Sequence, residues 1–368
     1  MDTLLSNNFF NRAIILTLLA TSLTACGGGG SSNSDSSNPT PTPTPIPTSP
    51  TTITPTNSAV ELVAMKLLNE NRSQCGFGSL TANQNLNLTA MNHASYIASV
   101  TEINKQPFAS HEEQAETGLL DTGIINPYYS GIDLATRLNP STLGKNAVST
   151  HYDDQAQGEN ISLSNFSTKD SGYTVNDTAT VEAMLYNLFA APYHLRTLVY
   201  PQFTEVGLSY QLVKWTANNE INHTSLLEIV SALPSSQKYI ENTKLLNFPC
   251  HGVTTGYELT DETPNPFGTT RNLKDQPIGQ PVYVLAPFDK IIKDATISMT
   301  INGQSVGVIH KLMAANDPNR SLKDNEIVFM PDRELQPSST YQVSYQLSYT
   351  DGTYSQPRSF SFATQPKL

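Results

Sequence analysis

The hydrophobic pattern of the first folded part of the chain predicts three helices. Ser58 and Glu61 have the spacing of a capping box, and apolar residues at helical spacing follow them, which predicts a helix over about 59–72. The same spacing recurs over 86–97 and again over 181–189. Each of these stretches is expected to bury one face against a common core.

Two strand-like runs come after the third helix, at 204–213 and 224–233. The second run is apolar enough to be a central strand. Asn218 and Asn219 lie between the two runs, where they predict the tip of a hairpin-type loop. His223 falls in the same connection, so we expect it to be exposed.

The last part of the chain has a different pattern. Residues 253–280 are polar and punctuated by Pro and Gly, which is typical of an inter-domain linker. Six or seven short alternating segments then fill residues 281–368 and predict a β-sandwich. Leu335 to Tyr341 resembles the tyrosine-corner segment of fibronectin type III and other Ig-like domains. With no acidic or histidine cluster at ligand spacing, this part is interpreted as a spacer or adhesion module.

The N-terminus carries an export signature. Arg12 precedes an apolar run that is too short to span a membrane as a mature helix, and the run ends in Leu-Thr-Ala-Cys26. This ending resembles the lipobox of bacterial lipoproteins, in which residues 1–25 are removed and Cys26 is lipidated; an ordinary signal peptide is the alternative. Gly27 and Gly28 resemble the sorting signal of lipoproteins destined for the outer membrane. The prediction is a lipid-anchored protein of the bacterial cell envelope.

Composition adds a tether and excludes one class of partner. Residues 26–57 are rich in Gly and Ser and then in Pro and Thr, which predicts a flexible piece followed by an extended spacer. The whole chain has a formal net charge of −11 with 14% charged residues. Because nucleic-acid binding requires patches of Lys or Arg, and none is visible, nucleic acid is not expected as a partner.

The chain has three cysteines. If Cys26 is consumed by the lipid, Cys75 and Cys250 remain, and two thiols in an exported protein most simply pair with each other. The alternative is that Cys75 is a nucleophile.

Three histidines are candidates for chemistry. His194 follows Pro192 at the end of the third predicted helix, at a corner from which it can point into a cleft. His111 precedes an acidic run, and with Glu113 it could share a metal ion, although such loop residues are usually solvated. His93 lies on the apolar stripe of the second helix, where a histidine is more often a hydrogen-bonded core residue than a ligand.

Five short motifs occur in an order that resembles the bacterial branch of the CAP superfamily, which includes cysteine-rich secretory proteins, antigen 5 and pathogenesis-related proteins. They are NENR (69–72), SH (110–111), GENIS (158–162), APYHLR (191–196) and FTEVGLSY (203–210). The resemblance covers residues 58–252. It implies an α+β fold, namely an α/β/α sandwich with a central antiparallel sheet, followed here by the Ig-like domain.

The resemblance also implies a cleft with two histidines and two glutamates that bind a divalent metal such as zinc in some members. His111, Glu159 and His194 match three of these positions. Ala191 stands at the best match for the fourth, and no acid lies between Ala183 and Thr204. Three ligands would leave a coordination position open for water. However, hydrolysis would need another general base, such as Glu112 or Glu113. The alternative is that no metal binds and the three residues hydrogen-bond one another.

The leading hypothesis is therefore a membrane-tethered binding protein whose cleft takes a small apolar, lipid or sterol-like ligand or a partner peptide. A metal-dependent hydrolase that uses His111, Glu159 and His194 is one alternative. A structural envelope or adhesion protein is another. The missing acid weighs against an enzyme.

Overall fold

The computed structural model describes residues 57–138, 152–239 and 241–367, all within one compact unit, Ile53–Leu368. The predicted signal peptide, Cys26 and the predicted tether up to residue 56 lie outside the described residues. Within the described part of the chain, no helix is both long enough and apolar enough to cross a membrane.

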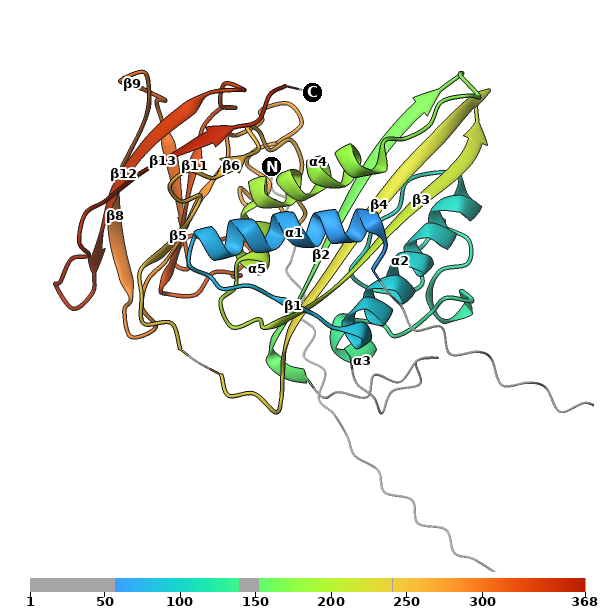
Figure 1. The fold of residues 1–368 in the computed structure, drawn as a ribbon, viewed down its shortest axis with the longest axis horizontal. Helices are drawn as coiled ribbons and strands as arrows, with labels where there is room; N and C mark the ends of the chain where they lie inside the picture. Colours follow the sequence, from blue (N-terminus) through green and yellow to red (C-terminus); the bar gives the residue numbers. More distant parts are fainter. Residues whose placement is uncertain (1–56, 139–151, 240, 368) are drawn as a thin grey trace, which may run out of the picture. The chain divides into compact units, whose positions relative to one another are not determined.

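The first part of the fold is a four-stranded sheet with helices on both faces (Figure 1). The strand order is β1-β3-β4-β2, in which β2, β4 and β3 are antiparallel and β1 runs parallel to β3. The strands are β1 (Thr81–Ala82), β2 (Tyr152–Thr168), β3 (Glu205–Ala217) and β4 (Glu220–Pro234). The helices are α1 (Ala59–Gln74), α2 (Gln84–Asn104), η1 (Gly123–Ile125), α3 (Leu134–Leu138), α4 (Asp177–Ala190) and α5 (Pro192–Leu198).

Each face of the sheet has its own apolar contacts. Ala94 and Ile97 of α2 cluster with Leu226 on one face, whereas Leu68 of α1 and Leu185 of α4 join the cluster of the other face. Helix α2 starts so close to β3 that a Cβ on Gly207 would lie 1.9 Å from the Leu86 carbonyl carbon. Only glycine fits at this crossing.

The local predictions for this part are largely confirmed. Ser58 accepts from the Glu61 amide and Glu61 accepts from the Ser58 amide, so the capping box is present. Asn218 and Asn219 both have positive φ, as a tight two-residue hairpin requires.

The expectation that His223 is exposed is wrong. Because the hairpin turn takes only two residues, β4 starts at Glu220 and includes His223, which is 3% exposed. The Tyr173 ring packs against it edge to face, with centroids 5.5 Å apart. An apolar-run criterion misses such a position, because its cover comes from residues far away in the sequence.

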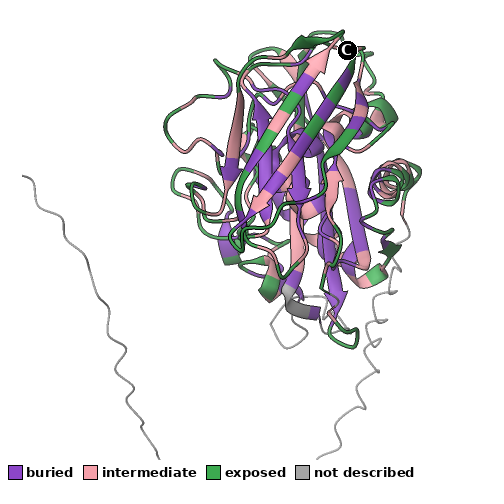
Figure 2. Ribbon diagram, turned by 90° about the vertical axis from the view of Figure 1, so that its left-hand side faces the viewer, coloured by how far each residue is buried: buried purple, intermediate pink, exposed green. Residues whose placement is uncertain are grey.

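The second part is an all-β region of two sheets. Their strand orders are β10-β11-β7-β5 and β6-β13-β12-β8-β9. The first sheet contains β5 (Leu246–Phe248), β7 (Val282–Leu285), β10 (Ile309–Met313) and β11 (Glu326–Pro331). The second contains β6 (Thr254–Thr255), β8 (Ile292–Ile301), β9 (Gln304–Ser305), β12 (Thr340–Tyr349) and β13 (Arg358–Thr364). Buried and more exposed positions alternate along β12, as Figure 2 shows.

The two parts share one hydrophobic core. Phe189 of α4 stacks on Phe248 of β5 with ring centroids 4.7 Å apart, and the core continues into Val284 of β7. The disulfide between Cys75 and Cys250 is present, with an S–S distance of 2.12 Å, so that prediction is confirmed.

Residues 253–280, the predicted linker, pack closely against their surroundings. Strand β6 pairs with β13, and an isolated bridge joins Leu259 to Ile278. Val253, Leu259 and Ile278 are all buried. Although this segment is polar in composition, a few buried apolar residues fix it to the fold. Its acidic residues thereby lie against the first part of the fold.

A candidate ligand-binding pocket and two histidine clusters

A pocket of about 840 Å³ lies along the edge strand β2. Its walls come from β2, the loop before η1, the junction of α4 and α5, and residues 258–263. The apolar lining is Ala109, Ile161, Leu163, Leu188, Ala191 and Leu259. The ionisable lining is His111, Glu112, His194, Glu258, Asp261 and Glu262. None of the described lining residues is Lys or Arg, so the pocket has a negative field when its acids are ionised.

His111 and His194 both line this pocket, and their ring centroids lie 6.4 Å apart with the ring planes tilted by 30°. His111 comes from the loop after α2. His194 lies in the first turn of α5, a short helix that starts at Pro192 directly after α4 ends. The sequence predicted a loop after Pro192, but proline fits the first position of a helix, where its missing N–H is not needed.

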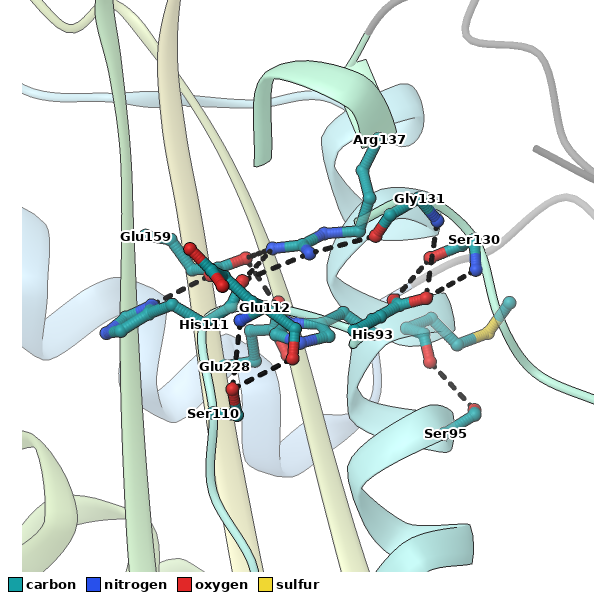
Figure 3. Close-up of polar contacts among 12 residues, drawn as sticks. His93, Ser95, Ser110, His111, Glu112, Ser130, Gly131, Arg137, Glu159 and Glu228 are labelled. Atoms are coloured by element: carbon teal, nitrogen blue, oxygen red, sulfur yellow. Dashed lines mark hydrogen bonds and ion pairs between the residues drawn. The ribbon is translucent and has the colours of Figure 1, made fainter. Parts of the chain in front are cut away.

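Glu159 of β2 joins His111 to a buried network (Figure 3). Its Oε2 lies 2.8 Å from His111 Nδ1, and its Oε1 lies 2.5 Å from Arg137 Nη2. The Glu159 side chain is only 4% exposed. Burial alone would raise its pKa, but Arg137, His93 and His111 outweigh burial and hold the pKa of Glu159 well below the usual range. Glu159 is therefore ionised at neutral pH.

His93 of α2 and Glu228 of β4 complete this network. His93 Nδ1 lies 2.9 Å from Glu228 Oε1 and 3.3 Å from Glu159 Oε1, and all three side chains are nearly or fully buried. Burial lowers the pKa of His93, but the two carboxylates outweigh it and raise the pKa to about 9. Burial raises the pKa of Glu228 to about 8, against the opposing effect of His93. This geometry agrees with the interpretation of His93 as a hydrogen-bonded residue of the core.

Within the described residues, the one group of three or more histidines and acids whose ligand atoms all lie within 4.8 Å of one another is His93, Glu159 and Glu228. The Arg137 guanidinium already contacts the Glu159 carboxylate at this point. An added cation would therefore meet a buried positive charge, which fits an ion-pair network better than a metal site.

The neighbouring acids of His111 have separate partners. Glu113 is 1% exposed and accepts hydrogen bonds from the Ser130 amide at 2.5 Å and the Ser130 hydroxyl at 2.7 Å. It therefore holds a loop and is not paired with His111. Glu112 is exposed and lines the pocket.

Glu262, like Arg137 and Glu228 of the buried network, is a residue that sequence reasoning missed. It comes from the segment predicted as a linker, and its Oε1 lies 3.3 Å from His194 Nδ1. The same oxygen accepts from the Tyr193 amide at 2.8 Å and the His194 amide at 3.4 Å. Burial raises the pKa of Glu262, against the opposing effects of His194 and the two amides. No periodicity or motif marks this position, so only the tertiary structure reveals it.

The structure thus brings His111 and Glu159 into contact and places the His194 ring beside the His111 ring in the same pocket. Both oxygens of Glu159 are already engaged by Arg137 and the two histidines. The zinc site of His111, Glu159 and His194 stays a prediction, and no chemical step is derived through a metal.

Comparison with known proteins gives one family match. Residues 65–217 match the CAP family model, described as the cysteine-rich secretory protein family. No curated protein matches the chain.

Some solved structures show weak likeness. CopC from Methylosinus trichosporium OB3b has a TM-score of 0.23 at 12% identity, covering 34% of this chain and 97% of that one. The titin domains z1z2 in complex with telethonin have a TM-score of 0.16 at 7% identity, covering 58% of this chain and 88% of that one. The sialic acid binding region of a Streptococcus sanguinis SK1 adhesin has a TM-score of 0.13 at 8% identity, covering 57% and 74%. Scores this low carry no argument about fold or function.

The family match covers α2, β2, α4, α5, all of β3 and most of α1, together with His111, Glu159 and His194. These observations support a CAP superfamily domain over residues 65–217 of this mixed α+β chain.

Proposed function

We propose that this protein is an exported, membrane-tethered CAP-domain protein whose pocket binds a small amphipathic molecule. One observation carries the proposal: an apolar wall and two carboxylate-backed imidazoles line the same pocket of about 840 Å³. Pockets of this size and mixed lining are typical of small-molecule sites.

The polar side of the pocket suggests the chemistry of the ligand. The described lining contains acids and histidines and no Lys or Arg, so a negatively charged head group would meet like charge. A neutral hydroxyl or a positively charged amine would instead find hydrogen-bond acceptors. The proposed ligand is therefore a lipid-like or sterol-like molecule, or a peptide side chain, with a hydrogen-bond-donating polar end.

We also propose a CAP-type sandwich, an Ig-like domain and a lipid anchor for this chain. Helices on both sheet faces support a CAP-type α/β/α sandwich. In the β region, the Tyr341 hydroxyl accepts from the Gln336 amide at 2.6 Å, as a tyrosine corner of an Ig-like domain does. The lipobox-like ending at Cys26 supports a lipid anchor in the bacterial envelope, with the outer membrane as the destination.

A metal-dependent hydrolase is less well supported. The carboxylate that it would need as a ligand, Glu159, is already paired with buried Arg137. Zinc binding that disappears in His194→Ala would count for the hydrolase and against the present proposal.

The test is to extract small molecules from the purified full chain and identify them by mass spectrometry. Ala109 is an exposed residue of the pocket lining, so Ala109→Trp can fill the pocket at little cost to folding, and Ala109→Ser is the matched control. We expect an amphipathic molecule in the wild-type chain and in Ala109→Ser, reduced at least about tenfold in Ala109→Trp, which corresponds to about 1.4 kcal/mol. The same molecules at equal amounts in all three proteins would overturn the proposal.

A further inference from the structure

Helix α5, which carries His194, is held by side chains that lie outside the family match. Ala191, at its N-cap position, makes no side-chain capping hydrogen bond. The carboxylate of Glu262 takes that role instead, accepting from the amides of Tyr193 and His194. A carboxylate at a helix N-terminus satisfies unpaired donors and complements the helix dipole.

Two more acids of the β region bind the same helix. The Tyr193 hydroxyl donates to Asp317 Oδ1 at 2.5 Å, and Arg196 Nε lies 2.7 Å from Glu326 Oε2. Glu326 is buried and also accepts from the Tyr283 hydroxyl at 3.0 Å. Three consecutive contacts along one short helix therefore come from the C-terminal part of the chain.

The contact between Glu262 and His194 determines which ring nitrogen carries the proton. Glu262 Oε1 already accepts the amides of Tyr193 and His194. In the ionised carboxylate this oxygen can only accept, so His194 Nδ1 donates to it. The neutral imidazole then keeps its lone pair on Nε2.

We infer that Glu262 is a positioning residue that orients His194 and presents the His194 Nε2 lone pair to the pocket. The β region thereby contributes a residue that fixes a ligand-binding side chain of the pocket. This inference rests on the proposed function for its purpose. Glu159 holds His111 in the same way through Nδ1. The two imidazoles then offer two acceptor nitrogens to a ligand that bears a hydroxyl or ammonium group.

The tautomer of His194 tests the inference directly. The full chain is labelled with ¹⁵N-histidine, and His194 is assigned from the signal that disappears in His194→Gln. Spectra are recorded at about pH 8.5, where an ordinary imidazole is neutral. We expect His194 to be protonated at Nδ1 in the wild-type chain. In Glu262→Ala, we expect the two nitrogen shifts to exchange positions, as the ordinary Nε2-protonated form returns.

Asp261→Asn is the matched control, because it removes an acid of the same segment whose side chain is 63% exposed and pairs with Lys274 rather than His194. The His194 tautomer should not change in it. The His111 signals should stay in place in Glu262→Ala, which shows that the fold is kept. If that variant does not fold, Glu262→Gln replaces it; its amide is a weaker acceptor, so the Nδ1-protonated fraction should fall.

An Nε2-protonated His194 in the wild-type chain would overturn the inference. So would a His194 tautomer that stays the same in both Glu262→Ala and Glu262→Gln. This readout needs no ligand. A tautomer that switches as expected in a chain without any extractable ligand would therefore contradict the proposed function alone.

Discussion

Two histidine–carboxylate pairs of this protein have the same chemistry and opposite surroundings. His93 and Glu228 lie 2.9 Å apart with both side chains fully buried. His194 and Glu262 lie 3.3 Å apart, but the His194 side chain is 14% exposed and lines a pocket. In the first pair the imidazole ends in the core, where His93 Nε2 has no partner among the described residues. In the second pair the imidazole is available to a ligand.

Burial determines whether such a histidine–carboxylate pair acts on stability or on binding. A fully buried pair must offset its desolvation through further charges, here Arg137 and Glu159, and its effect falls on the stability of the sheet and α2. A pair with one open edge can hold its histidine in a fixed tautomer for binding. The first pair should therefore control stability, and the second should control ligand affinity.

The largest expected effect comes from removing Arg137 from the buried network. In Arg137→Met, Glu159 loses a charge partner 2.5 Å away, and the free energy of unfolding should fall by about 3–5 kcal/mol. Urea denaturation measures this loss. Lys66→Met is the control, because Lys66 forms an exposed pair with Glu70 at 3.7 Å and should cost about 0.5 kcal/mol or less. Equal losses in the two variants would show that the network does not stabilise the fold.

The buried pair also predicts a pH dependence. In the folded chain the pKa of His93 is about 9 and that of Glu228 is about 8. In the unfolded chain both groups have their ordinary, lower pKa values and lose the proton at lower pH. The folded state therefore binds more protons between about pH 4.5 and 9, so stability is greatest at the acidic end of this window and falls as pH rises across it. Urea midpoints at pH 6 and about pH 9.5 measure this fall. Glu228→Gln should flatten it, and stability that rises over the same window would contradict the assignment.

The pocket pair should behave in the opposite way. In His194→Ala the free energy of unfolding should fall by about 1 kcal/mol, less than in Arg137→Met, because buried Glu262 loses one hydrogen bond but keeps the Tyr193 and His194 amides as donors. Affinity for a long-chain alkyl amine probe should fall about tenfold, or about 1.4 kcal/mol, as one acceptor is lost. Isothermal titration measures the affinity. His251→Ala, which replaces an exposed histidine outside the pocket, should bind the probe like the wild-type chain.

The sequence predicts only part of each cluster. Local rules identify the capping box at Ser58 and the hairpin tip at Asn218, because each depends on neighbouring residues. Motif resemblance singles out His111, Glu159 and His194. Glu228 is hidden in an otherwise apolar run and Glu262 in a polar stretch, and each gains its partner only through tertiary packing.

His223 is a residue whose burial, rather than its partner, depends on tertiary packing. Its sequence context is a loop-like polar stretch, yet pairing in β4 and the Phe166 and Tyr173 rings bury it. Burial of a polar residue depends on which distant side chains cover it, and a single sequence does not encode that locally.

The most direct test of the account compares three probes that share one alkyl chain and differ only in the polar end: an amine, an alcohol and a carboxylate. Affinities are measured with the full chain, and Ala109→Trp serves as the pocket-filled control. We expect the amine and the alcohol to bind, and the carboxylate to bind at least about tenfold more weakly, because it meets like charge and no Lys or Arg among the described lining residues. A carboxylate that binds as tightly as the amine, or binding that survives in Ala109→Trp, would contradict the account.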